Sequence, residues 1–478
     1  SRERPPGRPE APHVVRPGTH PLGEGIEPQM DTDKNRLKPA FDFSSGESSV
    51  LLYQGQAEMR IEGNIYAGDG KIRLDLLPRA NIHLYGYFSG VSLKDAMETS
   101  IGQKEISSFS INGHQIEGFM ISSGPNAAAQ QYNIKWCPKS EPVTVVGDDS
   151  TQMTRVVFHL FNFVDLFGTR RSTEQNGTAM HAIEHVDLAC DGWKVELKSL
   201  PSTREDIKKL KQEGGYRLTH IGEIQKADQT SFTRKDADDC LYGLRFFLSF
   251  AKGGWCEPIC AVGFDTSGNR VWESWSSPRD SWQNPLTWFD PHNSSQISSL
   301  FPGFMKRWAD DDWREALREV IYWYLNANFS SRGIDAGIIL TQAAIERLSY
   351  EYSVKEKKLL SSKGFKDLLA SDKFRLLFSS LRIPLDIPPE TPNLQTLAPA
   401  DQMNWLDAPH ALTEIRNSLV HPEHKRRGQF GNVYYEAWNL GLWYLEMGIL
   451  AICGYSGTYG NRLRQRWVGQ TEDVPWKE

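Results

Sequence analysis

The chain has 478 residues, of which 39% are hydrophobic and 11% are aromatic, and it contains 15 tryptophans. This apolar content is enough for two or three domains with large cores, and it excludes a generally disordered protein. The formal net charge of −6 excludes a protein that binds nucleic acid through an overall positive charge, although a local basic patch is compatible with it. The sequence shows no apolar leader and no window of 18 apolar residues, so we expect a soluble protein that does not enter a membrane. Its six scattered cysteines are typical of a reducing compartment, so we expect it in the cytoplasm.

The first half of the chain is predicted to be a short tail followed by a β-rich domain. Residues 1–40 are rich in proline, glycine and charge, so we predict a flexible tail, or one that docks extended along the body, and assign it no function. Residues 41–277 form short runs of alternating apolar and polar residues between turn residues, which predicts antiparallel strands in a β-sandwich or open barrel. Helices are predicted near Ser92 and between a cap at Thr233 and a stop at Gly253. We interpret this domain as a sensor or recruitment module.

A pair of histidines and a group of tryptophans are candidate ligand sites in the sequence. His181 and His185 are four residues apart, which on a helix would place two imidazoles on one face as metal ligands; alternatively they form a hydrogen-bonded pair. They have no evident third ligand, so we predict no metal and no cofactor. Five tryptophans form either a platform on which bases or sugars stack or part of the sheet core: Trp255, Trp272, Trp275, Trp282 and Trp288.

The second half is predicted to be helical. Residues 278–302 contain several prolines and many serines and asparagines, which predicts a linker or a loop wrapped across the domain boundary. Residues 303–478 have helical periodicity, so the whole chain is predicted as α+β, with an N-terminal antiparallel β-rich domain and a C-terminal all-α bundle. Within the bundle, the proline-rich stretch 388–399 is predicted to be a non-helical loop.

The stretch from Asp407 to Gln429 combines a helix with an arginine, a histidine and a basic exit. Its apolar residues recur at helical spacing, and Asp407 stands at the N-cap position. Arg416 and His421 are separated by four residues. Because proline disfavours helical conformation in the residue before it, Pro422 places His421 at or just past the last turn, where it can approach Arg416.

This pair of side chains has the chemistry for metal-free cleavage of RNA. The guanidinium of Arg416 presents a planar fork of donors that matches phosphate oxygens and could stabilise a pentacovalent phosphorane. An imidazole changes charge near neutral pH, so His421 could take the proton of a ribose 2′-OH or deliver one to the departing 5′-oxygen. In the alternative interpretation, Arg416 forms an ordinary ion pair with Glu414 or Glu423, and His421 caps a helix end.

The motif and its surroundings resemble the R-x(4–6)-H motif of the HEPN superfamily, in which a polar residue commonly follows the arginine, as Asn417 does here. The helical runs from Trp313 to Tyr352 and from Val433 to Gly457 fit this resemblance, and they look most like the ApeA-type abortive-infection branch. The resemblance covers roughly Trp308 to Trp467. It implies an endoribonuclease that cuts cellular RNA, with tRNA a candidate, in anti-phage defence or stress shutdown, and it implies a homodimer formed through the bundle.

Further residues are predicted to support cleavage. Glu346 follows an apolar run, so it could face inward and orient Arg416, or it could be an exposed residue of the helix surface. Basic residues that would contact RNA phosphates are grouped at the exit of the motif and near the C-terminus: Lys425, Arg426, Arg427, Arg462, Arg464 and Arg466. The alternative function is a non-catalytic protein whose bundle docks nucleic acid or a partner and whose β-rich domain carries the specificity.

Overall fold

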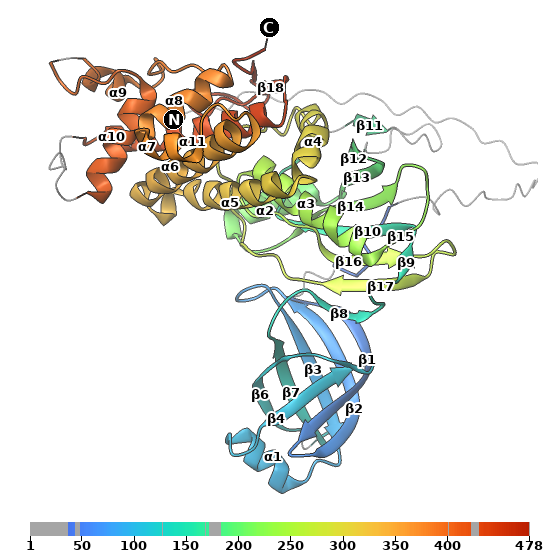
Figure 1. The fold of residues 1–478 in the computed structure, drawn as a ribbon. Coiled ribbons are helices and arrows are strands. Elements are labelled where there is room, and N and C mark those ends of the chain that lie inside the picture. The colour runs from blue at the N-terminus through green and yellow to red at the C-terminus, as the bar shows by residue number, and fades with distance from the viewer. Residues whose placement is uncertain are drawn as a thin grey trace, which may run out of the picture. The chain divides into compact units, whose positions relative to one another are not determined.

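The computed structural model describes residues 37–43, 48–126, 128–167, 169–171, 183–399, 401–421 and 430–477. An antiparallel β-rich region comes first and a helical region follows it, so the predicted α+β class is confirmed (Figure 1). Among the helices in these ranges, none combines the length and the apolar character that crossing a membrane requires.

The first sheet is entirely antiparallel and buries one of its faces. Ile72 and Leu84 point to the buried face, whereas the neighbouring Lys71 and Tyr85 point to the opposite face and are half-exposed, as the two-residue period of a strand requires. Helix α1 (Leu93–Ser100) packs against this sheet. The strands lie in the order β5 (His114–Gln115), β4 (Ile106–Ile111), β1 (Ser49–Ile61), β2 (Asn64–Asp75), β3 (Asn81–Ser89), β7 (Gln131–Pro138) and β6 (Gly118–Asn126).

The second sheet is buried on both faces in its central strand. Phe158 of β10 belongs to the core on the side of the helices, whereas Phe161 belongs to a second core shared with the first sheet. Helices α2 (Thr203–Glu213) and α3 (Arg234–Lys252) come from this part of the chain. The strands lie in the order β11 (Thr169–Arg171), β12 (Ile183–Cys190), β13 (Trp193–Ser199), β14 (Leu218–Lys226), β10 (Arg155–Phe161), β16 (Ile259–Phe264), β17 (Arg270–Trp275) and β8 (Val143–Val146).

The helical region is built around α11, which is buried along most of its length. Helix α6 packs against α5, α8 and α11, and α10 packs against α6, α8 and α11. A π-helical turn at Glu351–Glu356 extends α6. The helices are α4 (Ser295–Trp308), α5 (Asp311–Ala327), α6 (Ile334–Tyr350), α7 (Ser362–Asp367), α8 (Ala370–Ser380), α9 (Pro392–Leu397), α10 (Ala408–Val420) and α11 (Val433–Ile452), and a small ribbon follows, made of β18 (Thr458–Tyr459) and β19 (Glu472–Asp473).

One hydrophobic core runs from the second sheet into the helical region, so the linker predicted at 278–302 has to be corrected. Trp288 is completely buried in this segment, and α4 already begins at Ser295. Phe247 of α3 contacts Phe301 and Phe304 of α4, with ring centroids 5.0 and 5.3 Å apart. The composition of the segment is typical of a loop, but its aromatic residues hold it in the core. Burying each of these side chains stabilises the fold by about 2 kcal/mol.

The short segment 37–43 is docked on the second sheet, so residues 37–40 follow the docked alternative for the predicted tail. The backbone N–H of Ala40 donates to Nε2 of His159 at 3.0 Å, and Nδ1 of the same ring lies 3.0 Å from the carbonyl oxygen of Cys260. The rings of Phe41 and Phe43 lie 5.7 and 4.9 Å from the imidazole. Residues 1–36 of the predicted tail lie outside the described residues.

Several predicted helix ends are confirmed. Thr233 and Asp236 form a reciprocal capping box at the start of α3, and Gly253 ends this helix in the left-handed conformation with φ 75°. The stretch 388–399 departs from the prediction, because Pro392 begins a short helix, α9. Proline has no N–H to donate, and the first turn of a helix requires none, so it is tolerated there.

Candidate functional site

Helix α10 is anchored firmly at the end that is remote from its motif. The side chain of Asp407 accepts a hydrogen bond from the backbone N–H of His410 at 2.9 Å, which confirms the predicted N-cap. Arg375 of α8 binds both carboxylate oxygens of Asp407, at 2.6 and 3.0 Å. Leu412 and Ile415 are fully buried. The position of α10 is therefore set by its cap and its apolar face, and its C-terminal end carries the candidate catalytic residues.

Arg416 and His421 both lie at the C-terminal end of α10, as predicted. The helix ends at Val420, and His421 is extended, with φ −110° and ψ 111°. Its backbone N–H donates to the carbonyl oxygen of Asn417 at 2.9 Å, and the residue as a whole is exposed. Arg416 is half-buried, and its Nη1 donates to the side-chain oxygen of Asn417 at 3.2 Å. Pro422, predicted to end the helix, lies outside the described residues.

Glu346 does not occupy the place that was predicted for it. Its carboxylate accepts a bond of 2.5 Å from Nζ of Lys373 on α8, and its side chain is 45% exposed. Among the described residues, Arg416 forms no ion pair, so the predicted orientation of Arg416 by Glu346 is not observed. On α6 the neighbouring Ile345 faces the core, so Glu346 faces the surface and not Arg416.

The predicted phosphate-binding role of Arg462 is corrected by its burial. Its side chain is 1% exposed and contacts both carboxylate oxygens of Glu446, at 3.0 and 2.7 Å, and Glu446 is itself completely buried. Tyr324 donates to the same carboxylate at 2.6 Å. Burial alone would lower the pKa of Arg462, but the facing Glu446 outweighs burial and raises it. This charge holds α11, α5 and the C-terminal segment together and cannot reach an RNA strand.

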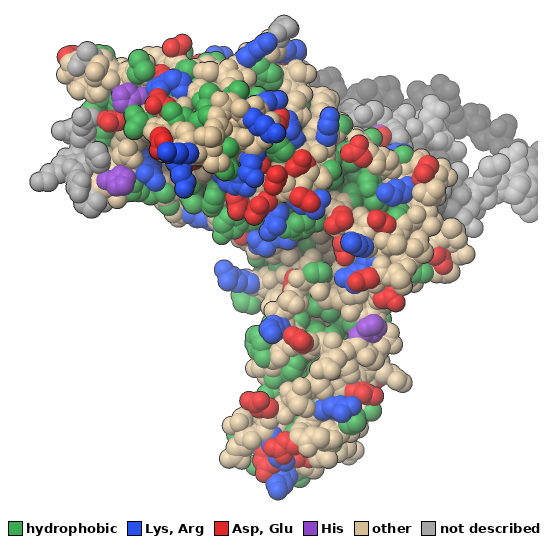
Figure 2. All heavy atoms as spheres, viewed as in Figure 1, with side chains coloured by type: hydrophobic (Ala, Val, Ile, Leu, Met, Phe, Trp, Pro, Cys, Tyr) green, Lys and Arg blue, Asp and Glu red, His purple; other side chains and the backbone are tan. Residues whose placement is uncertain are grey.

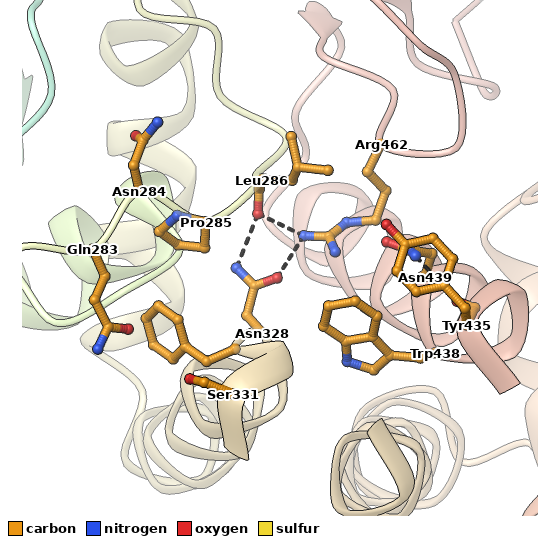
Figure 3. A pocket seen from close by; sticks show the side chains of 11 residues that line it. Gln283, Asn284, Pro285, Leu286, Asn328, Ser331, Tyr435, Trp438, Asn439 and Arg462 are labelled. Atoms are coloured by element: carbon orange, nitrogen blue, oxygen red, sulfur yellow. Dashed lines mark hydrogen bonds between the residues drawn. The ribbon is translucent and has the colours of Figure 1, made fainter. Parts of the chain in front are cut away.

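Arg462 also lies in the wall of a pocket of about 480 Å³ (Figure 3). There its guanidinium donates to the carbonyl oxygen of Leu286 at 2.8 Å and to the side-chain oxygen of Asn328 at 2.9 Å. The amide of Asn328 in turn donates to Leu286 at 2.9 Å. The guanidinium of Arg462 and the amide of Asn328 are therefore already used within the protein, and they make this side of the pocket a structural junction (Figure 3).

The other predicted RNA-binding residues differ in burial and in their ion pairs. Arg466 is largely buried and donates to Asp290 at 2.9 Å. Its predicted role in binding RNA phosphates is therefore corrected, as it is for Arg462. Arg464 is exposed and lies 2.7 Å from Glu390 and 3.0 Å from Glu472. On the face shown in Figure 2, basic and acidic side chains lie interspersed over the helices. Four residues that were predicted at sites lie outside the described ranges: Lys425, Arg426, Arg427 and His181.

Four of the five tryptophans in the predicted group are buried, and Trp282 is half-buried. Trp272, Trp275 and Trp288 are completely buried, so these three belong to the core. Trp255 is 7% exposed and lies in a second pocket, which also contains three arginines, Arg245, Arg279 and Arg318. These three arginines are far apart in the chain, so no sequence pattern groups them. The one available signal was the position of Arg318 on the polar face of an amphipathic helix.

Comparison with known proteins relates two regions of the chain to one named protein. Residues 148–285 match the family model described as the YopA central domain, and residues 310–473 match the YopA C-terminal domain. The chain is 29% identical over 443 residues to the SPbeta prophage-derived uncharacterized protein YopA of Bacillus subtilis (strain 168), and this alignment covers 90% of the chain and 95% of the relative. No solved structure matches the chain.

Proposed function

We propose that this chain is a metal-independent endoribonuclease of the HEPN type, with Arg416 and His421 as its catalytic residues. The observation that supports the proposal best is the end of α10. There, an exposed histidine stands just past the last turn, and a half-buried arginine lies within that turn. Both positions are compatible with contact to a strand bound at the surface, while the buried face of α10 holds them in place.

The proposed reaction is an internal transfer of the phosphoryl group within RNA. The imidazole of His421 removes the proton from a ribose 2′-OH, and the resulting oxygen attacks the adjacent phosphorus. The guanidinium of Arg416 stabilises the additional negative charge of the phosphorane. The bond to the 5′-oxygen then breaks, and that oxygen takes a proton from the protonated His421 of a second subunit, so the products are a 2′,3′-cyclic phosphate and a 5′-hydroxyl.

Cleavage assays with total RNA and with purified tRNA test the proposal. In EDTA, the intact chain should cut RNA and leave cyclic phosphate ends, whereas His421→Ala and Arg416→Ala should each reduce cleavage at least about a hundredfold. His114→Ala is the matched control, because His114 is also exposed but lies on β5. Wild-type cleavage by His421→Ala with an unchanged melting temperature would refute the assignment.

Two other results would direct the function elsewhere. A 5′-phosphate product that forms only with Mg²⁺ would indicate metal-assisted hydrolysis. RNA binding without cleavage, under conditions that relieve any autoinhibition, would favour the non-catalytic binding protein. The similarity to a prophage-derived protein supports a setting in which phage and host compete, such as anti-phage defence or stress shutdown.

A further inference from the structure

The second pocket has the volume and the lining of a site for a small ligand. It has a volume of about 380 Å³ and lies where α3 packs against α5. Trp255 and Phe246 line it with side chains that are only 7% and 6% exposed, whereas Tyr242 and Tyr322 are exposed. Ligand pockets are commonly concave, aromatic in their depth and polar at a few points, and this volume falls within their usual range.

Three guanidinium groups converge on this pocket from separate parts of the chain. Arg245 comes from α3, Arg279 follows β17, and Arg318 comes from α5. Nε of Arg245 lies 2.9 Å from Glu257. Across the ranges that the structure describes, Arg279 and Arg318 form no ion pair. Neither guanidinium is therefore paired directly with a carboxylate of the described residues, although Glu257 lies near enough for the charge of Arg279 to lower its pKa against the effect of burial. Both arginines are exposed.

The surrounding charges make the pocket favourable for an anion. Glu319 also lines it, but its carboxylate lies 2.7 Å from Nε of Arg347 and is engaged there. Burial lowers the pKa of Arg245, and the neighbouring Arg279 and Arg318 lower it further, against the opposing effect of Glu257. Three like charges are thus held close together, and a bound anion would relieve their mutual repulsion.

The aromatic rings hold two of these arginines in a useful orientation. The guanidinium carbon of Arg279 lies 4.2 Å from the ring centroid of Trp255, and that of Arg318 lies 5.8 Å from the centroid of Tyr242. A guanidinium that rests its face on a ring keeps the N–H groups at its edge available for phosphate oxygens. The exposed rings of Tyr242 and Tyr322 offer flat apolar surface against which a planar base can pack.

We propose that this pocket binds a nucleotide, whose phosphate contacts Arg279 and Arg318 and whose base packs against Tyr242 and Tyr322. A nucleotide uses both features of the pocket, whereas inorganic phosphate lacks the aromatic contact and a nucleoside lacks the charge. The ligand is either a free mononucleotide or the 5′-phosphorylated end of an RNA strand, because the two share this chemistry.

The pocket also joins the two regions that match the family models. Trp255 and Arg279 belong to the region 148–285, and Arg318 and Tyr322 belong to the region 310–473. A ligand that contacts both sides stabilises their packed arrangement by binding it selectively. Nucleotide binding should therefore raise the melting temperature of the whole chain.

Calorimetric titration of the full-length chain tests this site without using cleavage as a readout. The His421→Ala background removes any complication from RNA cleavage, so failure of the ribonuclease proposal leaves this test intact. We expect AMP, GMP or ATP to bind saturably, and adenosine and inorganic phosphate to bind at least tenfold more weakly. RNA oligonucleotides with a 5′-phosphate or a 5′-hydroxyl identify the source: tighter binding of the phosphorylated strand than of the mononucleotides indicates a strand end, and the reverse order indicates a free nucleotide.

Substitutions of exposed residues test whether the nucleotide binds in this pocket. Arg279→Ala and Arg318→Ala should each weaken nucleotide binding by about tenfold or more, because each removes a charge-assisted contact. Lys235→Ala removes the same charge from an exposed position on α3 outside the pocket and should leave the affinity unchanged. The absence of saturable nucleotide binding, or wild-type affinity in the Arg279→Ala, Arg318→Ala double variant, would overturn the proposal.

Discussion

Asn417 is the residue that connects both members of the candidate motif. Its side-chain oxygen accepts from Arg416, and its carbonyl oxygen accepts from the backbone N–H of His421. Any substitution at position 417 preserves the second bond, because that bond uses only the main chain. The side chain is therefore expected to position the guanidinium without affecting the histidine directly.

Substitution of Asn417 tests this positioning role. Asn417→Ala should reduce kcat/KM for RNA cleavage by roughly tenfold to a hundredfold, because a poorly oriented guanidinium stabilises the phosphorane less well. Asn417→Asp keeps an oxygen acceptor in the same place and should restore much of the rate. Thermal melting of both variants controls for folding, and full activity of Asn417→Ala alongside an inactive Arg416→Ala would contradict the idea.

His159 predicts how stability depends on pH. Burial lowers the pKa of its imidazole from 6.5 to about 4, although its bond to the Cys260 carbonyl opposes this change. As the pH falls below about 6.5 the unfolded chain binds a proton here, but the folded chain does not until about pH 4. The contribution of His159 to stability should therefore fall by about 3 kcal/mol across this window and then level off.

A single substitution separates this contribution from the rest. Gln in place of His159 has one amide that can accept from Ala40 and donate to Cys260, and it does not titrate. His159→Gln should therefore show a shallower loss of stability between pH 6.5 and 4 in denaturant unfolding experiments. The slope should decrease without disappearing, because burial also lowers the pKa of His220, to about 3. An unchanged slope would show that His159 is not the titrating group.

At the scale of elements, α11 and the C-terminal segment depend on one buried ion pair. Removing either partner leaves the other charge without its counterion in the core, so Arg462→Met should lower the free energy of unfolding by about 3 to 5 kcal/mol. The double variant Arg462→Met, Glu446→Leu should lose less than the Arg462→Met single variant, because it leaves neither charge. Chemical denaturation measures both, and a neutral effect of Arg462→Met would contradict the assigned role.

Prediction from sequence succeeded where the controlling contacts are local. The caps at Thr233 and Asp407 involve backbone groups within three residues, so their sequence pattern carries the necessary information. It failed for Arg462, whose burial depends on Glu446 across the bundle and on the Leu286 carbonyl in a distant segment. An arginine near a chain end has the same sequence pattern whether it faces solvent or closes a core, so only the three-dimensional structure separates the two cases.

At the scale of the whole molecule, the single histidine of the motif predicts a homodimer formed through the helical bundle. Transphosphorylation requires one group that accepts a proton and another that donates one. A twofold axis would bring Arg416 and His421 from two subunits into one cleft with a single kind of contact. Sedimentation of the active protein should therefore show a dimer, and a monomer that cleaves RNA at full rate would contradict this prediction.

Mixed subunits test whether such a site is shared. An excess of the His421→Ala variant, refolded together with wild-type protein, should reduce cleavage below the level given by the remaining wild-type subunits alone. Independent sites would instead leave activity proportional to the wild-type fraction. The Lys235→Ala variant, mixed in the same proportion, controls for dilution and refolding losses.

The continuous core constrains how genes of this kind can recombine. Phe247 meets Phe301 and Phe304 across the contact between α3 and α4. A hybrid that joined the central region of this chain to the helical region of its 29% identical relative from Bacillus subtilis would bring together faces that were not selected to fit. Each mismatched methylene in such a contact costs about 1 kcal/mol. Viable recombinants should therefore inherit α3, α4 and the remaining helices from a single parent.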